Sequence, residues 1–438
     1  MPPYRQSFRL AVPLILSNAT VPLLGMVDTA VIGRLPEPHH LGAVALGSVI
    51  MSTLMWLNGF LRIGTGGLTA QAFGAEDSDQ LRIVPLRAAL VALVTSLLIL
   101  GTAPALMSGA RLVFAPGEAV AAGMDTYLAI RIAGIPAILL TQVSVGWFLG
   151  QQRPLLPLLV MLTANGLNAV LDIVLVLKLG YGVEGVAVAT VAAEYTALAI
   201  ALLLARRQLR LLPRAPLPWR RIVDPAALGR FFRLSRDLVL RTLVMETVFI
   251  GFAALGTRQG ELILAANAVL MNFFTLQAHG LDGFSDATEA MTGRAVGRRS
   301  GPELRDAAIA GFVNAGLLAL LITAGFIAFG TTIVDLLTTI ESVRETARIY
   351  LPYVMALPLV SVWAFVMDGI FFGATRAREL RNAMLLSALV FVALTAAFLP
   401  HMGNHGLWAA FLIYMGTRGI ILWSIYWRSD RGAGFACP

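Results

Sequence analysis

Long apolar stretches recur along almost the whole chain, and they constrain its fold more than any other feature. The mean hydropathy is +0.78, and only 13% of the residues are charged, about half the share of roughly 25% found in soluble domains. A soluble fold would expose too much apolar surface, so the sequence predicts an all-α polytopic membrane protein. Each apolar stretch can cross a hydrocarbon core of about 30 Å as a helix. The twelve predicted spans are 10–33, 41–66, 84–108, 120–149, 154–178, 184–205, 233–256, 262–290, 307–330, 343–373, 381–400 and 405–427.

The second half of the chain repeats the first. The stretch "LTAQAFGAEDSDQLR" begins at Leu68 and aligns with "MTGRAVGRRSGPELR" at Met291, an offset of 223 residues (291 − 68). Identical pairs at this offset include Thr69 and Thr292, Gly74 and Gly297, Arg82 and Arg305, Phe148 and Phe371, and Gly150 and Gly373. Because each copy holds an even number of spans, both copies enter the membrane in the same sense, as in two-lobed transporters. The predicted division is an N-lobe 1–205, a cytoplasmic inter-lobe loop 206–230 and a C-lobe 231–438, with a substrate path expected between the lobes.

Arginine and lysine are unevenly distributed between the predicted loops. The two chain ends and the loops after spans 2, 4, 6, 8 and 10 hold 23 of them, and the opposite loops hold 6. The positive-inside rule therefore predicts cytoplasmic termini, in a bacterial inner (plasma) membrane. Topology also explains the net charge of +8, so we expect no nucleic-acid partner. The basic and apolar N-terminus has no clear cleavage site and is interpreted as the first span.

Several kinds of chemistry lack the residues they need. The only lysine, Lys178, stands in "VLKLG", so no Walker motif exists. The only cysteine, Cys437, cannot form a disulfide within the chain or a cysteine-based zinc site. His39 and His40 fall in a predicted loop, where we interpret them as structural or solvated. We expect no enzyme activity, no cofactor and no resident metal, and any pumping would draw on an ion gradient.

One carboxylate interrupts the first span. Asp28 lies in "VPLLGMVDTAVIG", where an ionised, unpaired group would cost several kcal/mol. Pro13, earlier in the same span, frees a backbone carbonyl and gives the helix a place to bend. An intramembrane carboxylate on a helix that can bend is typical of an ion-coupled site.

Spans 5 and 6 carry the matching polar groups. Asn165, Asn168 and Asp172 in "NGLNAVLD" are spaced i, i+3 and i+7 and share one face; Thr190 lies in the next span. Asp172 and Asp28 would form a carboxyl pair that holds H⁺, since repulsion and burial disfavour two charges. Carboxylate and carbonyl oxygens suit Na⁺ equally well. The alternative, in which these groups only hydrogen-bond one helix to another, applies best to Asn165.

The second half carries its own acidic residues. Asp282, Asp286 and Glu289 in span 8 are spaced i, i+4 and i+7, an acidic stripe that would suit a cationic substrate in a wet cavity. The alternative is that Asp282 and Asp286 pair with arginines from other spans.

Spans 7 and 10 add further charged residues. Asp237 and Arg241 lie four apart, so we expect them to pair with each other. Glu246 has no obvious local partner, and Asp368 precedes Gly369, which permits close packing.

Three stretches resemble one family over the whole chain. "VDTAVIG", "DGIFFGATRARELRNAM" and "GLDGFSDATEAMTGRAVG" are similar to the multidrug and toxic compound extrusion (MATE) family, and within it to the DNA-damage-inducible protein F (DinF) branch. The resemblance implies a cation-coupled antiporter that exports organic, often cationic compounds. Small organic substrates and the lipid bilayer are the expected partners, and we expect a monomer.

The resemblance also carries over residue roles. The family's N-lobe ion cluster matches Asp28, Asn168, Asp172 and Thr190, and its bending proline matches Pro13. Another branch of the family uses carboxylates in spans 7 and 10. Glu246 and Asp368 match that pair, so the chain holds candidates for both sites and the coupling ion stays open.

The leading hypothesis is H⁺-coupled efflux by alternating access. One alternative is Na⁺-coupled antiport of the same compounds, and another is a flippase of lipid-linked precursors, which would need a basic central cavity. A major-facilitator transporter would carry a Gly-x-x-x-Asp-Arg-like motif after span 2, where this chain has "GAEDSDQLR". A non-transporting scaffold or receptor would need no buried carboxylates.

Overall fold

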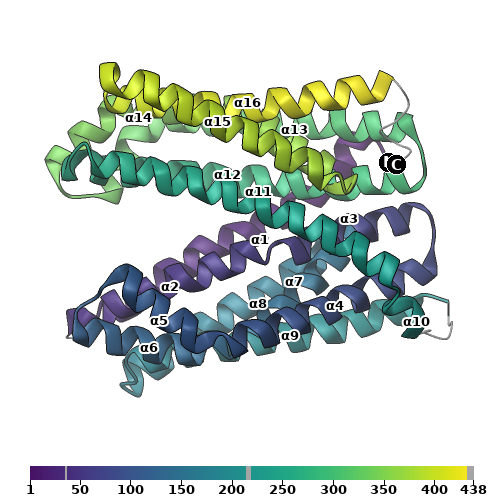
Figure 1. Ribbon diagram of the computed structural model, residues 1–438, viewed down its shortest axis with the longest axis horizontal. Helices are drawn as coiled ribbons and strands as arrows, with labels where there is room; N and C mark the ends of the chain where they lie inside the picture. The colour runs from purple at the N-terminus through teal and green to yellow at the C-terminus, as the bar shows by residue number, and fades with distance from the viewer. Residues whose placement is uncertain (35–36, 214–218, 432–438) are drawn as a thin grey trace. The chain divides into compact units, whose positions relative to one another are not determined.

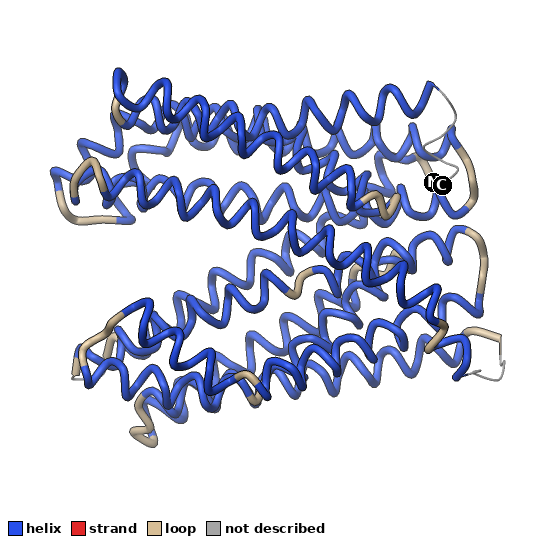
Figure 2. The backbone as a smooth tube through the Cα atoms, viewed as in Figure 1, coloured by secondary structure: helices blue, strands red, loops and turns tan. Residues whose placement is uncertain are grey.

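A computed structural model describes residues 1–34, 37–213 and 219–431. Cys437 and residues 214–218 of the predicted inter-lobe loop lie outside this range. Within the described residues every regular element is a helix, and the connections are short (Figure 2). The chain divides into two compact units, which we call the N-unit (Ala19–Phe231) and the C-unit (Met1–Asn18 with Phe232–Pro438).

The N-unit holds most of the shorter helices. Helix α1 begins in the C-unit and continues into the N-unit without a break in its helical structure at Pro13. Helices α8 and α9 lie side by side (Figure 1). The helices are α1 (Pro3–Ile32), α2 (Pro38–Leu57), α3 (Phe60–Gly74), α4 (Ser78–Gly101), α5 (Ala103–Phe114), α6 (Glu118–Ile132), α7 (Ile135–Gly150), α8 (Leu155–Asp172) with a π-helical continuation at Ile173–Lys178, α9 (Val183–Leu211) and α10 (Trp219–Ile222).

The C-unit is built from longer helices. Helix α12 packs along α14, and α15 packs along α16. The helices are α11 (Pro225–Thr257), whose first turns belong to the N-unit, α12 (Glu261–Gly297), α13 (Gly301–Leu337), α14 (Glu341–Gly373), α15 (Ala377–Met402) and α16 (Asn404–Arg431).

The boundary between the units differs from the predicted division at the N-terminus. The first eighteen residues group with the C-unit, whereas the prediction placed them in the N-lobe. Two contacts explain this grouping. A Cβ added at Gly283 would lie 2.4 Å from Ile15 Cγ1, and the Asn314 side-chain amide donates to the Tyr4 carbonyl at 2.9 Å.

The described part of the predicted inter-lobe loop is held by hydrogen bonds from α4. Arg87 on α4 donates to the Arg221 carbonyl at 2.7 Å and to the Ile222 carbonyl at 3.2 Å. These two bonds fasten α10 to the N-unit, so the described part of the segment 206–230 packs as part of that unit.

The helices agree with a multi-pass membrane protein. Among the described residues, ten helical stretches are long and apolar enough to cross a membrane, and α6 with α7, bent by 49°, forms an eleventh. Helix α1 has 30 residues and covers the first predicted span. The predicted all-α polytopic fold is confirmed. The third predicted span, 84–108, was too long, because α4 ends at Gly101 and α5 is a separate short helix.

The internal repeat reappears as a repeated helix crossing. A Cβ added at Gly146 on α7 would lie 2.2 Å from the Arg62 carbonyl oxygen on α3. At the same offset of 223, a Cβ at Gly369 on α14 would lie 2.2 Å from the Ser285 carbonyl oxygen on α12. Inside a bilayer, small residues at such crossings let two helix backbones pack closely.

The turns that follow these helices repeat as well. Glu76 and Arg299 have φ of 56° and 54°, and Gln152 and Thr375 have φ of 58° and 54°. Both pairs are 223 residues apart, and residues other than glycine seldom adopt positive φ. The two halves therefore share backbone conformation as well as a sequence pattern.

Candidate functional site

A polar cluster lies inside the N-unit where α1, α8 and α9 meet. Asn168 and Asp172 occupy one face of α8 and are 1% and 0% exposed. Asp28 on α1 is half-buried, and Thr190 faces the cluster from α9. We call these four residues the carboxylate cluster. The backbone changes to a π-helical turn directly after Asp172, a local widening that often accompanies functional sites.

The Asn168 amide joins the members of the cluster. Its orientation is assigned from its neighbours: the nitrogen donates to Asp28 Oδ1 at 3.3 Å and to Asp172 Oδ2 at 3.1 Å. Its oxygen lies 3.1 Å from Thr190 Oγ1. In this orientation one amide holds two carboxyl groups through both of its N–H bonds.

The two carboxyl groups also contact each other. Asp28 and Asp172 lie within hydrogen-bonding distance, and such a bond needs a proton on one of the two. Asp172 Oδ1, the oxygen that the Asn168 amide does not reach, is buried and receives no hydrogen bond from an N–H or O–H donor among the described residues. Two buried carboxyls that share one proton carry a single negative charge and can gain or lose a proton as a unit.

Asn165 lies outside this contact set. Its amide donates to Thr20 Oγ1 on α1 at 2.6 Å. It therefore ties α8 to the same helix that carries Asp28, and it does so without touching either carboxyl in the described contacts.

A buried ion pair beside the cluster was not predicted. Arg131 on α6 donates to Glu194 on α9 at 2.7 Å, and their side chains are 5% and 17% exposed. Arg131 also interacts electrostatically with Tyr127 and with Asp28. An arginine in the apolar run "YLAIRIAG" was the available signal, because a charge at that depth requires a partner.

The break between α6 and α7 makes room for this pair. A Cβ added at Gly134 would lie 2.2 Å from Glu194 Oε2, so no larger residue fits there without displacing the carboxylate. Next to Glu194, the Tyr195 hydroxyl donates to the Ala133 carbonyl at 2.9 Å. This hydrogen bond ties the backbone at the 49° bend between α6 and α7 to α9.

The C-unit contains a different charged centre. Asp368 on α14 receives hydrogen bonds from Arg241 on α11 and Arg418 on α16, and all three are at least 93% buried. The arginine planes also lie near the rings of Phe372 and Phe365. Because two guanidinium groups already neutralise one carboxylate, this centre is a poor place for a further cation.

The remaining C-unit candidates are spread over two helices. Glu246 is half-buried on α11 and has no hydrogen bond or ion pair within the described residues. Asp282 on α12 interacts electrostatically with Arg418 on α16. This agrees with the alternative in which Asp282 faces an arginine from another span. Asp286 and Glu289 follow on the same helix and are 8% and 1% exposed.

The pair expected within α11 does not form. Asp237 accepts from Arg381 on α15 at 2.7 Å and from the neighbouring Arg236 at 3.1 Å. Arg241 is bound to Asp368 instead. The prediction was wrong because helical spacing considers only partners on one helix, whereas α14 and α15 supply better placed charges.

One group of described side chains has the donors for a metal ion. Ligand atoms of Glu37, His39 and His40, at the start of α2, lie within 4.8 Å of one another. The His39 Nε2 to Glu37 Oε2 distance is 3.3 Å. All three are at least partly exposed, and the group is separate from the carboxylate cluster.

These features define a class: a multi-pass helical membrane protein of two repeated units, with ionisable side chains buried inside each of them. The MatE family pattern matches residues 13–174 and 239–397 of the chain. DNA damage-inducible protein F of Escherichia coli (strain K12) is 41% identical over 435 residues, which cover 98% of this chain and 93% of that protein. The chain belongs to the MatE family, and the resemblance seen in the motifs is confirmed.

More distant relatives extend the comparison. Protein DETOXIFICATION 44, chloroplastic, of Arabidopsis thaliana is 24% identical over 91% of this chain and 77% of its own length. A solved structure described as the outward-facing conformation of a multidrug resistance MATE family transporter of the MOP superfamily matches with a TM-score of 0.89. It covers 99% of this chain and 97% of that chain at 20% identity, a likeness of fold.

Proposed function

We propose that this chain is a secondary active exporter that uses H⁺ bound at the carboxylate cluster to drive antiport of organic cationic or amphipathic compounds. Membership of the MatE family supports export, since a solved structure of the same fold is described as a multidrug resistance transporter. The observation that carries the choice of ion is the contact between Asp28 and Asp172 under a shared amide donor. Two carboxyls placed this way are suited to hold one proton.

The proposed cycle uses the charge of this pair. In the outward-facing state Asp28 and Asp172 take up a proton, which removes their repulsion. Helix α1 then bends near Pro13, and the substrate leaves. In the inward-facing state the proton departs, the pair regains its charge and the transporter loads again. Each cycle carries H⁺ down its gradient, and this drives export. Coupling requires the affinity of the pair for H⁺ to differ between the two states.

The test is transport in proteoliposomes that hold the purified protein. A fluorescent cationic dye reports transport while a pH gradient is imposed in Na⁺-free buffer. Wild-type protein should respond to the gradient, and Asp28→Asn and Asp172→Asn should each reduce the response at least tenfold. Asp306→Asn, which changes an exposed carboxylate, is the matched control and should behave as wild type.

A second arm of the same experiment tests the coupling ion. The pH is clamped on both sides and a Na⁺ gradient is imposed. Transport that follows Na⁺ and ignores the pH gradient would support Na⁺-coupled antiport and overturn H⁺ coupling. Wild-type transport by Asp28→Asn under the pH gradient would remove the carboxylate cluster from the mechanism.

The proposed location is a bacterial inner (plasma) membrane with both termini in the cytoplasm. The excess of arginine in one set of loops supports this orientation. It would place the last turns of α9 and the start of α11 on the cytoplasmic side.

A further inference from the structure

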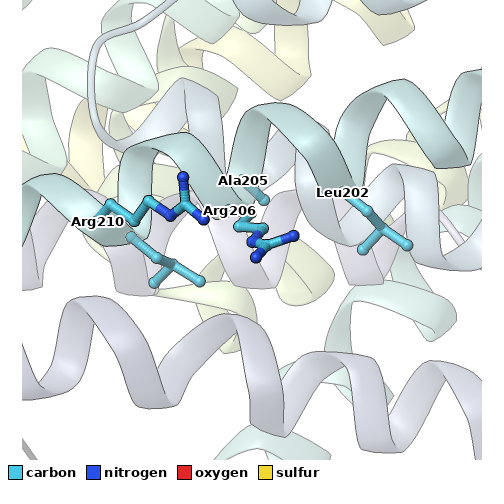
Figure 3. A pocket seen from close by; sticks show the side chains of 5 residues that line it. Leu202, Ala205, Arg206 and Arg210 are labelled. Atoms are coloured by element: carbon cyan, nitrogen blue, oxygen red, sulfur yellow. The ribbon is translucent and has the colours of Figure 1, made fainter.

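The last three turns of α9 form a surface groove of mixed polarity. The groove has a volume of about 700 Å³. We call it the α9 groove, and it is lined by Leu202, Ala205, Arg206, Leu209 and Arg210. These residues are spaced i, i+3, i+4, i+7 and i+8, so they share one face of the helix. Figure 3 shows Arg206 and Arg210 on successive turns, with Leu202 further along the same helix.

The two arginines of the groove are not engaged by the protein. Neither Arg206 nor Arg210 makes a hydrogen bond or an ion pair within the described residues, and both are exposed. Two arginines near the end of α9 do have partners: Arg82 donates to the Leu212 carbonyl at 2.9 Å, and Arg221 pairs with Asp79 at 2.8 Å. The groove therefore presents two positive charges that have no counter-charge on the described chain.

The polarity of the groove changes along the helix axis. Helix α9 is long and apolar enough to cross a membrane, so its basic final turns lie where the span leaves the hydrocarbon. Leu202 is 53% exposed and lies about 12 Å deeper than Arg210 at a rise of 1.5 Å per residue. From the C-terminal end of α9 inward, the lining residues are Arg210, Leu209, Arg206, Ala205 and Leu202. Both guanidinium groups therefore lie nearer the water than the exposed Leu202, which is the order of headgroup and acyl chain in a phospholipid.

We propose that the α9 groove binds one anionic phospholipid, with its phosphate held by Arg206 and Arg210 and its acyl chain along Leu202. Guanidinium groups bind phosphate through paired charge-assisted hydrogen bonds. Basic pockets at the ends of transmembrane helices are suited to anionic headgroups. Ala205 contributes by its small side chain, which leaves the hollow open between the arginines and Leu202.

The experiment measures lipid retained by purified protein and lipid added back to it. Protein stripped with detergent is titrated with phosphatidylglycerol, with phosphatidylcholine and with glycerol 3-phosphate. Bound lipid is counted by native mass spectrometry, and protection is followed by thermal unfolding. Wild-type protein should bind one phosphatidylglycerol and no phosphatidylcholine, and glycerol 3-phosphate should give no protection because it lacks the acyl chain.

Three variants separate a built site from general surface charge. The double variant Arg206→Gln/Arg210→Gln should bind phosphatidylglycerol at least tenfold more weakly. Arg207→Gln removes one charge from the same turn but not from the groove, and it should bind as wild type. Ala205→Leu fills the hollow and keeps both arginines, so it should also weaken binding while the protein still unfolds as one folded species.

Three results would overturn the proposal. Unchanged binding by the double variant would mean that the groove holds no lipid. Equal losses in Arg207→Gln and the double variant would mean that only surface charge attracts the headgroup. Protection by glycerol 3-phosphate equal to that by the lipid would identify a soluble phosphate site instead.

Discussion

Replacing Glu194 with glutamine should destabilise the N-unit measurably. The substitution keeps the shape of the side chain and removes its charge, which leaves Arg131 buried without its ion-pair partner at 5% exposure. Removing one partner of a buried pair costs about 3–5 kcal/mol. The glutamine oxygen can still accept from Arg131, so we expect the lower end, about 3 kcal/mol. For a unit of this size, that corresponds to a loss of roughly 6–12 °C in Tm.

The assay is thermal unfolding of purified protein in one detergent, read by the loss of monodisperse protein on size exclusion after heating. Glu184→Gln is the matched control, because it makes the same change at an exposed position on the same helix. It should change Tm only slightly, as expected for a glutamate in the first turn of a helix.

A double-mutant cycle tests the reason for the effect. Arg131→Gln/Glu194→Gln removes both charges, so it should be more stable than the sum of the two single losses predicts. A Tm of Glu194→Gln within about 1 °C of wild type would refute the reasoning. Strict additivity of the two single changes would also refute it, because the ion pair would then contribute no coupling.

Three further predictions concern packing, the charged centre of the C-unit and topology. Gly373→Ala should cost about 1–3 kcal/mol or more, since its Cβ would lie 2.4 Å from a backbone carbonyl oxygen; Gly316→Ala, which has open space, should be neutral or stabilising in the same unfolding assay. Asp368→Asn should lower Tm and the yield of folded protein strongly, because two buried guanidinium groups lose the carboxylate that both contact; wild-type yield and Tm would contradict this. In a cysteine-free background, a membrane-impermeant thiol reagent should label Thr339→Cys in intact cells and Gln80→Cys only after permeabilisation; the reverse pattern would invert the proposed orientation.

Hydropathy and the internal offset predicted the architecture because both reflect constraints that act along the chain. A span must be continuously apolar, and a repeated crossing must keep its small residues, as Gly146 and Gly369 do. The family assignment drew on the same local signal. The sequence could not predict that the first eighteen residues group with the C-unit. The contact of Ile15 with Gly283, which supports this grouping, joins segments far apart in sequence.

Electrostatic partners across helices were the least predictable part of the site. Spacing correctly placed Asn168 and Asp172 on one face of α8, since periodicity determines which residues share a face. It could not identify the pairing of Arg131 with Glu194, which are brought together by the packing of α6 on α9. The same limit produced the mistaken pairing of Asp237 with Arg241.

The repeat allows the carboxylate cluster to be tested against its own counterpart. At the offset of 223, Asn168 corresponds to Phe391, which is 3% exposed and packs near the Tyr414 ring. Equivalent backbone positions thus hold the amide of the proposed proton site in one unit and an aromatic core in the other. Asn168→Ala removes the donor to both carboxyls, so it should abolish the response of dye transport to the pH gradient while costing only about 1–3 kcal/mol of stability.

Phe391→Ala should give the opposite result. Truncating a buried phenylalanine costs about 3–5 kcal/mol, so Tm should fall further than in Asn168→Ala. Transport per folded molecule should still follow the pH gradient, because no titratable group of the cluster has changed. A wild-type response by Asn168→Ala would mean that the amide is not needed for coupling. Loss of the response by Phe391→Ala at full folding would mean that coupling is not confined to the N-unit. If Asn168→Ala loses the transport response and Phe391→Ala loses only stability, as expected, then one copy of the repeat is specialised for the ion and the other for packing.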